Sequence, residues 1–217
     1  MSKVLVANLM VMNREQREPL PRIGVLAIQG DYEAHGQALR EVGAEPVLVR
    51  KPDELADVDG LIIPGGESTT MLKFLERGGF LASLQDFVRT KPTFGTCAGC
   101  ILLATEVTHP PQQSLGVLNA TVERNAYGRQ IDSSIESAET KLPGGPLEMV
   151  YIRAPRMVKT GDGVTVLAER DGFPVLVEQG SILAATFHPE LSRDRRVHQR
   201  FVDMVRQRMT RGSSRSR

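Results

Sequence analysis

The chain has 217 residues, of which 41% are apolar and 24% are charged, and its 27 basic and 26 acidic side chains leave a formal net charge of +1. A net charge this close to zero gives no overall indication of a nucleic-acid or membrane-surface partner. The two cysteines are three positions apart, which excludes a disulfide framework and predicts a reducing compartment, the cytoplasm.

The length and patterning predict a single domain over residues 21–208. Residues 1–20 lack the long apolar stretch of a signal peptide, so we expect an N-terminal extension that need not be ordered. No apolar run reaches the roughly 18 residues of a membrane span. Residues 209–217 are predicted to be a basic flexible tail, and we interpret this basic end as solvated because no aromatic stacking platform accompanies it.

The first half of the chain alternates short apolar runs with helical spacing. Strands are predicted at 23–28, 46–49, 60–63 and 92–96, and helices at 32–42 and 69–87, the second broken at two glycines. Continuous apolar runs are typical of strands buried on both faces. This order predicts βαβ units and an α/β fold, a three-layer α/β/α flavodoxin-like arrangement around a mainly parallel sheet.

The pattern of the sequence changes after a Pro-rich break at residues 109–111. Short strands joined by Gly and Pro turns are predicted, followed by one helix: strands at 118–124, 130–137, 149–153, 164–169, 175–178 and 182–187, and the helix at 195–208. We expect these strands to be antiparallel additions to the sheet.

One cysteine lies where a nucleophile would be expected. Residues 95–99 are Gly-Thr-Cys-Ala-Gly, between a predicted strand and an apolar helix that continues to Ala104. This is the thiol form of the nucleophile elbow, in which the helix start favours the thiolate of Cys97 and the backbone N–H of Ala98 can join an oxyanion hole. A cysteine in an apolar segment is otherwise a small buried side chain, and Cys97 with Cys100 also forms a Cys-x-x-Cys pair. Since the glycines frame Cys97 alone, we expect Cys100 to face the core.

A thiol nucleophile needs a base and a group that orients the base. Of the four histidines, His35 is most simply a surface residue of the first helix, His109 lies in the Pro-rich loop and His198 lies in the basic terminal helix. His188 instead leaves the end of a buried strand, as Cys97 does, and such ends meet at one edge of an open α/β sheet. Glu190 can then fix the tautomer of His188.

A second loop follows another strand end. Residues 64–68 are Pro-Gly-Gly-Glu-Ser, and two glycines before a helix allow close approach of backbone N–H groups. A phosphate loop is one interpretation, but the Walker lysine is missing. We therefore favour an oxyanion-hole donor, Gly66, beside the thiol.

Together these segments resemble the glutaminase subunit of pyridoxal 5′-phosphate synthase, a class I glutamine amidotransferase. The resemblance covers residues 21–208 and rests on 23–30 (Ile-Gly-Val-Leu-Ala-Ile-Gln-Gly), 65–69 (Gly-Gly-Glu-Ser-Thr), 95–99, 124–130 (Arg-Asn-Ala-Tyr-Gly-Arg-Gln), 152–155 (Ile-Arg-Ala-Pro) and 188–190 (His-Pro-Glu). The elbow and His-x-Glu alone indicate only the superfamily. Two departures are Cys100, where such proteins usually carry a larger aliphatic residue, and residues 1–20.

The resemblance implies hydrolysis of L-glutamine through a Cys97–His188–Glu190 triad and a γ-glutamyl thioester. It implies that glutamine is held by Gly65, Gly66, Glu67, Arg124, Ile152 and Arg153. It also implies a partner, a (β/α)₈-barrel synthase subunit that receives the ammonia in a large hetero-oligomer, and no metal or organic cofactor.

Other functions remain open at this stage. A glutaminase could serve a synthase that makes imidazole glycerol phosphate or GMP, although residues 124–130 argue against that. A cysteine peptidase of a related α/β fold and a non-catalytic regulatory module are further alternatives, and intact Cys97, His188 and Glu190 argue against the regulatory module.

Overall fold

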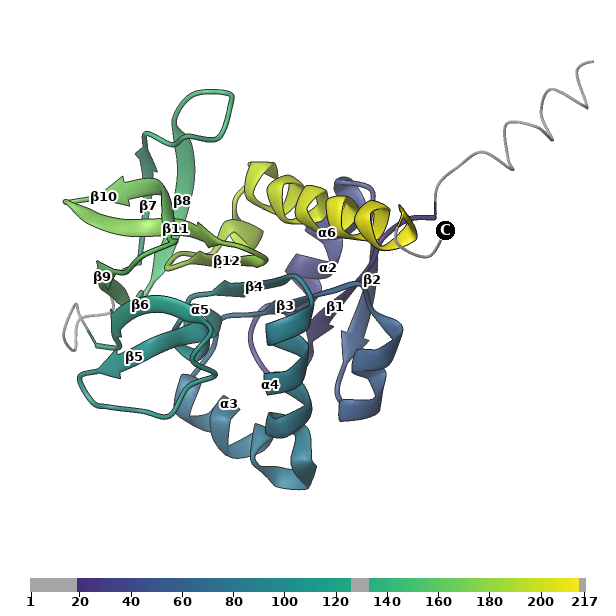
Figure 1. Ribbon diagram of the computed structural model, residues 1–217. Coiled ribbons are helices and arrows are strands. Elements are labelled where there is room, and N and C mark those ends of the chain that lie inside the picture. Colours follow the sequence, from purple (N-terminus) through teal and green to yellow (C-terminus); the bar gives the residue numbers. More distant parts are fainter. Residues whose placement is uncertain (1–18, 126–132, 215–217) are drawn as a thin grey trace, which may run out of the picture.

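The structure, a computed structural model, describes residues 19–125 and 133–214 (Figure 1). Its centre is a seven-stranded sheet with the order β10-β11-β12-β4-β3-β1-β2. The five strands β12, β4, β3, β1 and β2 are mutually parallel, and β11 and β10 add antiparallel strands at one edge. The strands of this sheet are β1 (Arg22–Leu26), β2 (Glu45–Val49), β3 (Gly60–Ile63), β4 (Thr93–Thr96), β10 (Thr165–Arg170), β11 (Phe173–Gln179) and β12 (Ile182–Ala185).

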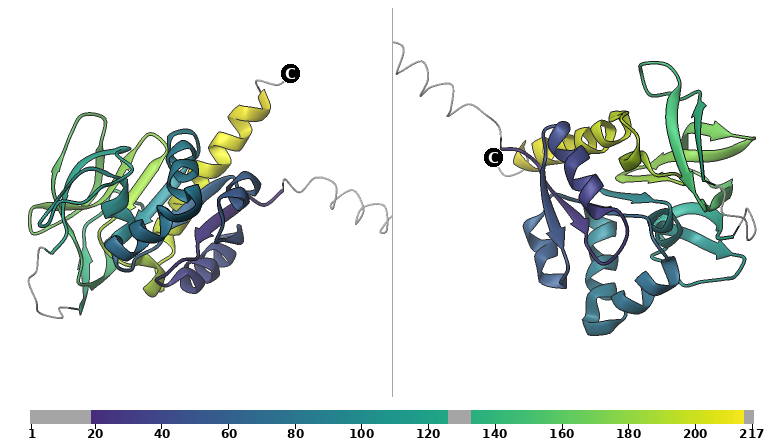
Figure 2. Two further views of the ribbon diagram at one scale, coloured as in Figure 1. Left: turned by 90° about the horizontal axis from the view of Figure 1, so that it is seen from below. Right: turned by 180° about the vertical axis from the view of Figure 1, so that it is seen from behind.

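Helices cover both faces of this sheet (Figures 1 and 2). On one face lie α3, α4 and α5, and on the other α2 packs beside α6. The helices are α2 (Tyr32–Glu41), α3 (Ser68–Leu75), α4 (Phe80–Thr90), α5 (Ala98–Leu103) and α6 (Arg196–Ser214), with short 3₁₀ turns η1 (Pro52–Asp57), η2 (Arg77–Gly79) and η3 (Pro189–Leu191). The predicted three-layer α/β fold is confirmed.

Strand β3 is apolar along its whole length because both of its faces are buried. In β3, Leu61 and Ile63 join the core beneath α3 and α4, whereas Ile62 joins the core beneath α2 and α6. All three side chains are fully buried. Successive side chains of a strand point to opposite faces, so a three-layer fold requires apolar residues at consecutive positions.

The strand register sets the position of the site. Ile63 pairs with Gly95 on β4, and Thr96 pairs with Ala185 on β12. The carboxyl ends of β3, β4 and β12 are therefore level with one another. The segments that follow these strands, which begin at Pro64, Cys97 and Thr186, consequently emerge side by side at one edge of the sheet.

The second half of the chain departs in part from the prediction. Strands β10 and β11 are antiparallel additions to the central sheet, as expected. The strand predicted at 182–187 is β12, which was also expected to be antiparallel but pairs parallel with β4. Three other predicted strands lie in two separate small sheets. One sheet contains β5 (Ala104–Thr108), β6 (Leu118–Glu123) and β9 (Arg156–Thr160), and the other contains β7 (Ser133–Ala138) and β8 (Leu147–Ile152).

Two strands and two helix ends also differ from the prediction. The elbow helix ends at Leu103 instead of Ala104, and residues 104–108 form β5, a strand that was not predicted. Its pairing with β6 is a long-range contact that local spacing does not reveal. Strand β9 was not predicted. Helix α6 continues to Ser214 instead of ending near 208. The predicted domain boundaries at residues 20 and 208 remain predictions. Two predicted segments lie largely outside the described residues: most of the N-terminal extension, and residues 126–130 of the Arg-Asn-Ala-Tyr-Gly-Arg-Gln stretch. No helix in the described ranges is both long and apolar enough to cross a membrane.

Candidate active site

Cys97 occupies the sharp turn between β4 and α5. Its backbone has φ 48° and ψ −104°, a conformation that L residues rarely adopt and that holds a side chain out of the sheet at this turn. Its N–H donates to the Ala185 carbonyl of β12 at 2.9 Å, which ties the turn to the neighbouring strand. The residue is only 6% exposed. The predicted elbow is therefore present, with Cys97 nearly enclosed.

The glycines of the elbow are needed because other backbone lies against them. A Cβ on Gly99 would lie 2.0 Å from the Ile63 carbonyl oxygen, and one on Gly95 would lie 2.6 Å from the carbonyl of Gly99. Both neighbours are backbone and cannot move aside without shifting β3 or α5. Glycine is therefore required at both positions because α5 packs closely on the sheet.

We expect Gly99→Ala to destabilise the fold by about 3 kcal/mol, at the upper end of overpacking substitutions. In a chain of this length that corresponds to a fall of roughly 6–12 °C in the unfolding midpoint, measured by differential scanning calorimetry. Gly212→Ala in α6 is the matched control, because a Cβ there meets nothing within 4 Å. The control should be neutral or stabilising by up to about 1 kcal/mol. Equal midpoints for the two variants would contradict this account of the elbow.

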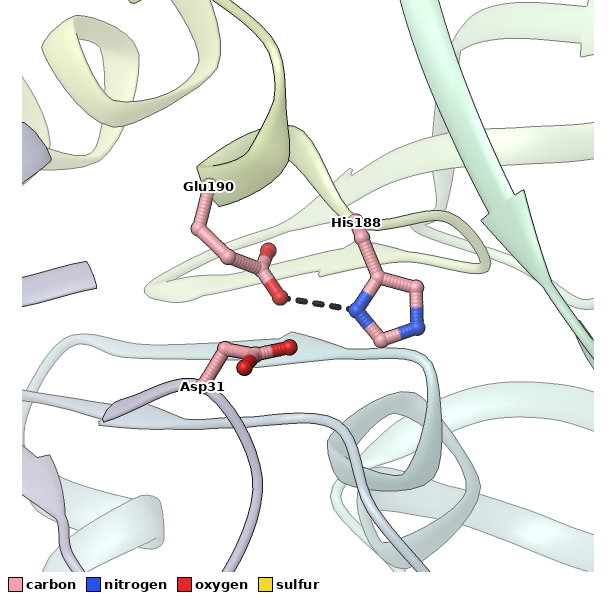
Figure 3. A group of neighbouring side chains, drawn as sticks. All are labelled: Asp31, His188 and Glu190. Atoms are coloured by element: carbon pink, nitrogen blue, oxygen red, sulfur yellow. Dashed lines mark hydrogen bonds and ion pairs between the residues drawn. The ribbon is translucent and has the colours of Figure 1, made fainter. Parts of the chain in front are cut away.

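His188 and Glu190 follow β12 and lie beside Cys97. His188 Nδ1 donates to Glu190 Oε1 at 2.7 Å, as Figure 3 shows. The His188 backbone N–H donates to the Val150 carbonyl of β8 at 2.8 Å. Both side chains are buried. The structure therefore brings together the three residues singled out from the sequence.

The electrostatics of His188 favour its charged form. Burial by itself acts to lower the pKa of His188, but its interactions with Cys97 and with Glu190 outweigh burial and raise the pKa to about 10. Burial likewise acts to raise the pKa of Glu190, and the neighbouring His35 and His188 outweigh it and lower that pKa. The pair is therefore an imidazolium and a carboxylate near neutral pH.

The Gly65–Gly66 turn after β3 closes over the same residues. A Cβ on Gly65 would lie 2.5 Å from His188 Cε1 and 3.4 Å from the Cys97 Cβ atom. Gly66 has φ +135° and packs against the side chain of Gln29. Only glycine fits these two positions. At Gly65 there is no space for a Cβ atom, and at Gly66 the backbone conformation is one that L side chains rarely adopt.

Glu67 fixes the start of α3 and reaches Arg124. Its carboxylate accepts from the N–H groups of Thr69 at 3.0 Å and Thr70 at 2.7 Å, and lies 3.4 Å from Arg124 Nη2. Arg124 also donates to Thr69 Oγ1 at 2.6 Å. Burial acts to raise the pKa of Glu67, but hydrogen bonds from Thr70 and Thr69 outweigh it and lower the pKa to about 2. Glu67 and Arg124, predicted from the resemblance, are thus in one cluster.

Ile152 and Arg153 lie where β8 ends, two and three residues beyond the Val150 carbonyl that binds His188. Arg153 is exposed and has φ 45°, so the chain turns sharply there.

Cys100 is fully buried and faces the core, as predicted. This burial raises the pKa of its thiol to about 12.

Several residues near the site were not anticipated. His35 was expected at the surface, but it is 0% exposed, and so is His198. His35 lies on the same face of α2 as Ala38 and Leu39, both buried, so its helical spacing from them was a usable signal. Asp31 is also near the site, and its carboxylate lies beside His188 and Glu190 in Figure 3.

Asp31, His188 and Glu190 have the composition of a metal site, because one ligand atom from each lies within 4.8 Å of the others. The closest contact within the group is the 2.7 Å hydrogen bond between His188 and Glu190. A cation bound there would compete for the carboxylate that orients His188. We therefore interpret the group as acid–base machinery.

The sequence and fold of this chain match those of known proteins. The model of the SNO glutamine amidotransferase family matches residues 25–207. The chain is 60% identical over 185 residues to the pyridoxal 5′-phosphate synthase subunit PdxT of Koribacter versatilis, covering 85% of this chain and 96% of that protein. It is 52% identical over 192 residues to the subunit of the same name from Solibacter usitatus, covering 86% and 100%. A crystal structure of a glutamine amidotransferase matches with a TM-score of 0.78 and 46% identity, covering 84% of this chain and 98% of that one. This chain therefore belongs to the SNO glutamine amidotransferase family.

Proposed function

We propose that this protein hydrolyses L-glutamine to L-glutamate and ammonia, and that it supplies the ammonia to a synthase subunit that makes pyridoxal 5′-phosphate. The observation that carries the proposal is the strained, nearly enclosed Cys97 beside the hydrogen-bonded His188–Glu190 pair. The relatives named as pyridoxal 5′-phosphate synthase subunits support the choice of product.

In the first half-reaction the Cys97 thiolate attacks the side-chain carbonyl carbon of glutamine. The charged His188 beside the sulfur favours the thiolate. Collapse of the tetrahedral intermediate breaks the C–N bond, and His188 gives its proton to the departing nitrogen, which leaves as ammonia. Glu190 holds the imidazole ring in place and stabilises its charge, since its carboxylate accepts from Nδ1.

In the second half-reaction water attacks the γ-glutamyl thioester. Neutral His188 now takes a proton from that water, the C–S bond breaks, and glutamate leaves. The thiolate and the imidazolium are thereby restored. Burial of Cys97 and His188 keeps bulk water away from the thioester until ammonia has left the site.

The oxyanion would be held by the backbone N–H groups of Ala98 and Gly66. Ala98 is the first residue of α5, so its N–H has no intrahelical partner. Removing one such donor typically costs about 10²–10³ in rate. The φ of +135° at Gly66 makes the direction of its peptide adjustable at little cost, which suits a donor that is aimed only when substrate or partner binds.

The glutamine would be held by Gly65, Gly66, Glu67, Arg124, Ile152 and Arg153. The carboxylate of Glu67 already accepts two N–H groups and faces Arg124, so its first role is to fix the loop and the arginine. The exposed Arg153 at the end of β8 offers a guanidinium that can pair with the α-carboxylate of the substrate.

The partner would be a (β/α)₈-barrel synthase subunit within a large hetero-oligomer, because ammonia released into water is protonated and lost. We expect glutamate release from L-glutamine to rise at least about tenfold when that synthase subunit is added, a conformational coupling of about 1.4 kcal/mol. The measurement is a coupled assay with glutamate dehydrogenase.

A GMP-forming or imidazole glycerol phosphate-forming synthase is the control partner and should give no stimulation. Stimulation by the control alone would assign the protein to a different pathway. Cleavage of peptides with no glutamine hydrolysis under any condition would contradict the glutaminase function itself.

A further inference from the structure

Two buried histidines lie behind the proposed triad and have no place in the mechanism above. His35 comes from α2 and His198 from α6, the two helices that pack together on one face of the sheet (Figures 1 and 2). Both side chains are fully buried. Burying two imidazoles is costly unless their nitrogens find partners, so their contacts indicate what they do.

The contacts form a continuous row that ends at Glu190. His198 Nε2 lies 3.0 Å from His35 Nδ1. On the other side of the His35 ring, Nε2 lies 3.2 Å from Thr96 Oγ1 and 3.3 Å from Glu190 Oε2. The other oxygen of that carboxylate, Oε1, is the one that accepts from His188. The Glu190 carboxylate therefore lies between two imidazoles.

The chemistry of these atoms fixes the direction of each hydrogen bond. Ionised Glu190 can only accept, so an attractive contact requires a proton on His35 Nε2, and the Thr96 hydroxyl oxygen then accepts from that same N–H. His35 Nδ1 then has no proton and accepts a hydrogen bond from His198 Nε2–H. This leaves His198 Nδ1 without a proton, and within the described part of the chain that atom has no hydrogen-bond partner. An unpaired lone pair there costs less than a buried, unpaired N–H.

Charge supports the same arrangement. Burial, the largest influence, lowers the pKa of His35 and lowers that of His198 well below its usual value, so both are neutral donors near pH 7. The charged groups that act on His35 are Glu190 and His188 after β12 and Asp31 before α2, and Arg195 acts on His198. A neutral donor orients Glu190 without adding a cation that would oppose the charge on His188.

We propose that His35 is a positioning residue of this site: its Nε2–H holds the second oxygen of Glu190, and His198 fixes the tautomer that makes this possible. Among the described residues Oε2 has no partner with full hydrogen-bond geometry, and His35 Nε2, at 3.3 Å, is placed to become that partner through a small rotation of the carboxylate about its last torsion. The inference rests on the proposed function, because the purpose of an oriented Glu190 is to orient His188.

The tautomer can be measured directly in the wild-type protein. Nitrogen-15 chemical shifts of labelled histidine side chains should show His35 neutral, protonated at Nε2 and unprotonated at Nδ1, at pH 7. The signals of His35 are those missing in His35→Gln. A His35 protonated at Nδ1, or a charged His35, would overturn the proposal, and this result does not depend on glutaminase activity.

Two amide variants separate positioning from packing. In His35→Gln the amide group reaches the place of Nε2, whereas in His35→Asn it reaches only the place of Nδ1. We expect His35→Asn to lose about 10–100-fold in kcat, as for other residues that orient a catalytic imidazole, with KM little changed. The acidic limb of the pH–rate profile of His35→Asn should move to higher pH. The reason is that the Glu190 carboxylate loses a hydrogen-bond donor that favours its ionised form, which raises the pKa of Glu190. His35→Gln should recover most of kcat.

The control is His109→Asn, whose side chain is 73% exposed and should leave kcat unchanged. Unfolding midpoints of all three variants should be measured beside the kinetics. Equal losses in His35→Asn and His35→Gln, or full activity in His35→Asn, would refute the positioning role. Wild-type protein with no glutamine hydrolysis would instead refute the proposed function and leave the tautomer result standing.

Discussion

Replacing Cys97 by alanine should lower the rate of glutamine hydrolysis by at least about 10³-fold, because no other group in the proposed mechanism can form the thioester. The substitution removes only a sulfur atom from a residue that is 6% exposed, and the strained turn that holds it is set by Gly95 and Gly99 packing against backbone. The fold should therefore survive. Glutamate release measured in the presence of the synthase subunit gives the loss in kcat/KM directly.

Cys100→Ala is the matched control, with the same chemical change three residues further along the same buried segment. It should stay within a few-fold of wild type in activity, even if it costs some stability. Intact-protein mass spectrometry after rapid acid quenching should show a γ-glutamyl adduct on wild type and on Cys100→Ala but none on Cys97→Ala. Equal damage from the two substitutions would favour a redox role for the Cys-x-x-Cys pair over the nucleophile assignment.

The sheet and the main elements of the site were predictable because local patterns carry them. Residues 23–26 and 60–63 are buried on both faces, so apolar character at consecutive positions is required there. The elbow was recognisable because two glycines at fixed spacing are needed where α5 touches β3. His188 stood out from the other histidines because it directly follows a buried strand, as Cys97 does.

The features that were missed depend on contacts between distant segments. His35 and His198 are 163 positions apart and meet only because α2 and α6 cover the same face of the sheet. A polar residue on an apolar helix face indicates that it has a buried hydrogen-bond partner, but the sequence does not indicate which residue that partner is. In the same way, the pairing of β5 with β6, and of β7 with β8, is settled by tertiary packing and not by the composition of each strand.

Glu190→Gln should lower kcat by about 10³–10⁴-fold, comparable to the loss when the acid of a Ser-His-Asp triad is made an amide. A glutamine amide can present its N–H₂ group to His188 Nδ1 and so favour the wrong tautomer. It also removes the negative charge that helps keep the pKa of His188 high. Glu33→Gln, at an exposed position in the first turn of α2, is the matched control and should not alter kcat.

The pH dependence of this variant tests the electrostatics separately from the rate. In wild type the pKa of His188 is raised from 6.5 to about 10, so its stabilising contribution is complete below pH 6.5 and is lost as pH rises toward 10. The free energy of unfolding from urea titrations should therefore fall over this window in wild type. In Glu190→Gln the imidazolium loses a partner, so the fall should still begin near pH 6.5 but should be smaller and end at lower pH.

Alkylation of Cys97 by iodoacetamide reports the same change at the nucleophile. The charged His188 lies beside the sulfur, so weakening that charge in Glu190→Gln should change the pH profile of the alkylation rate, with slower alkylation than wild type at pH 7. A variant that loses activity but keeps the wild-type alkylation profile would mean that Glu190 acts on the orientation of His188 and not on its charge. A variant with wild-type kcat and an unchanged profile would remove Glu190 from the mechanism, and with it the reason for a second histidine to hold its carboxylate.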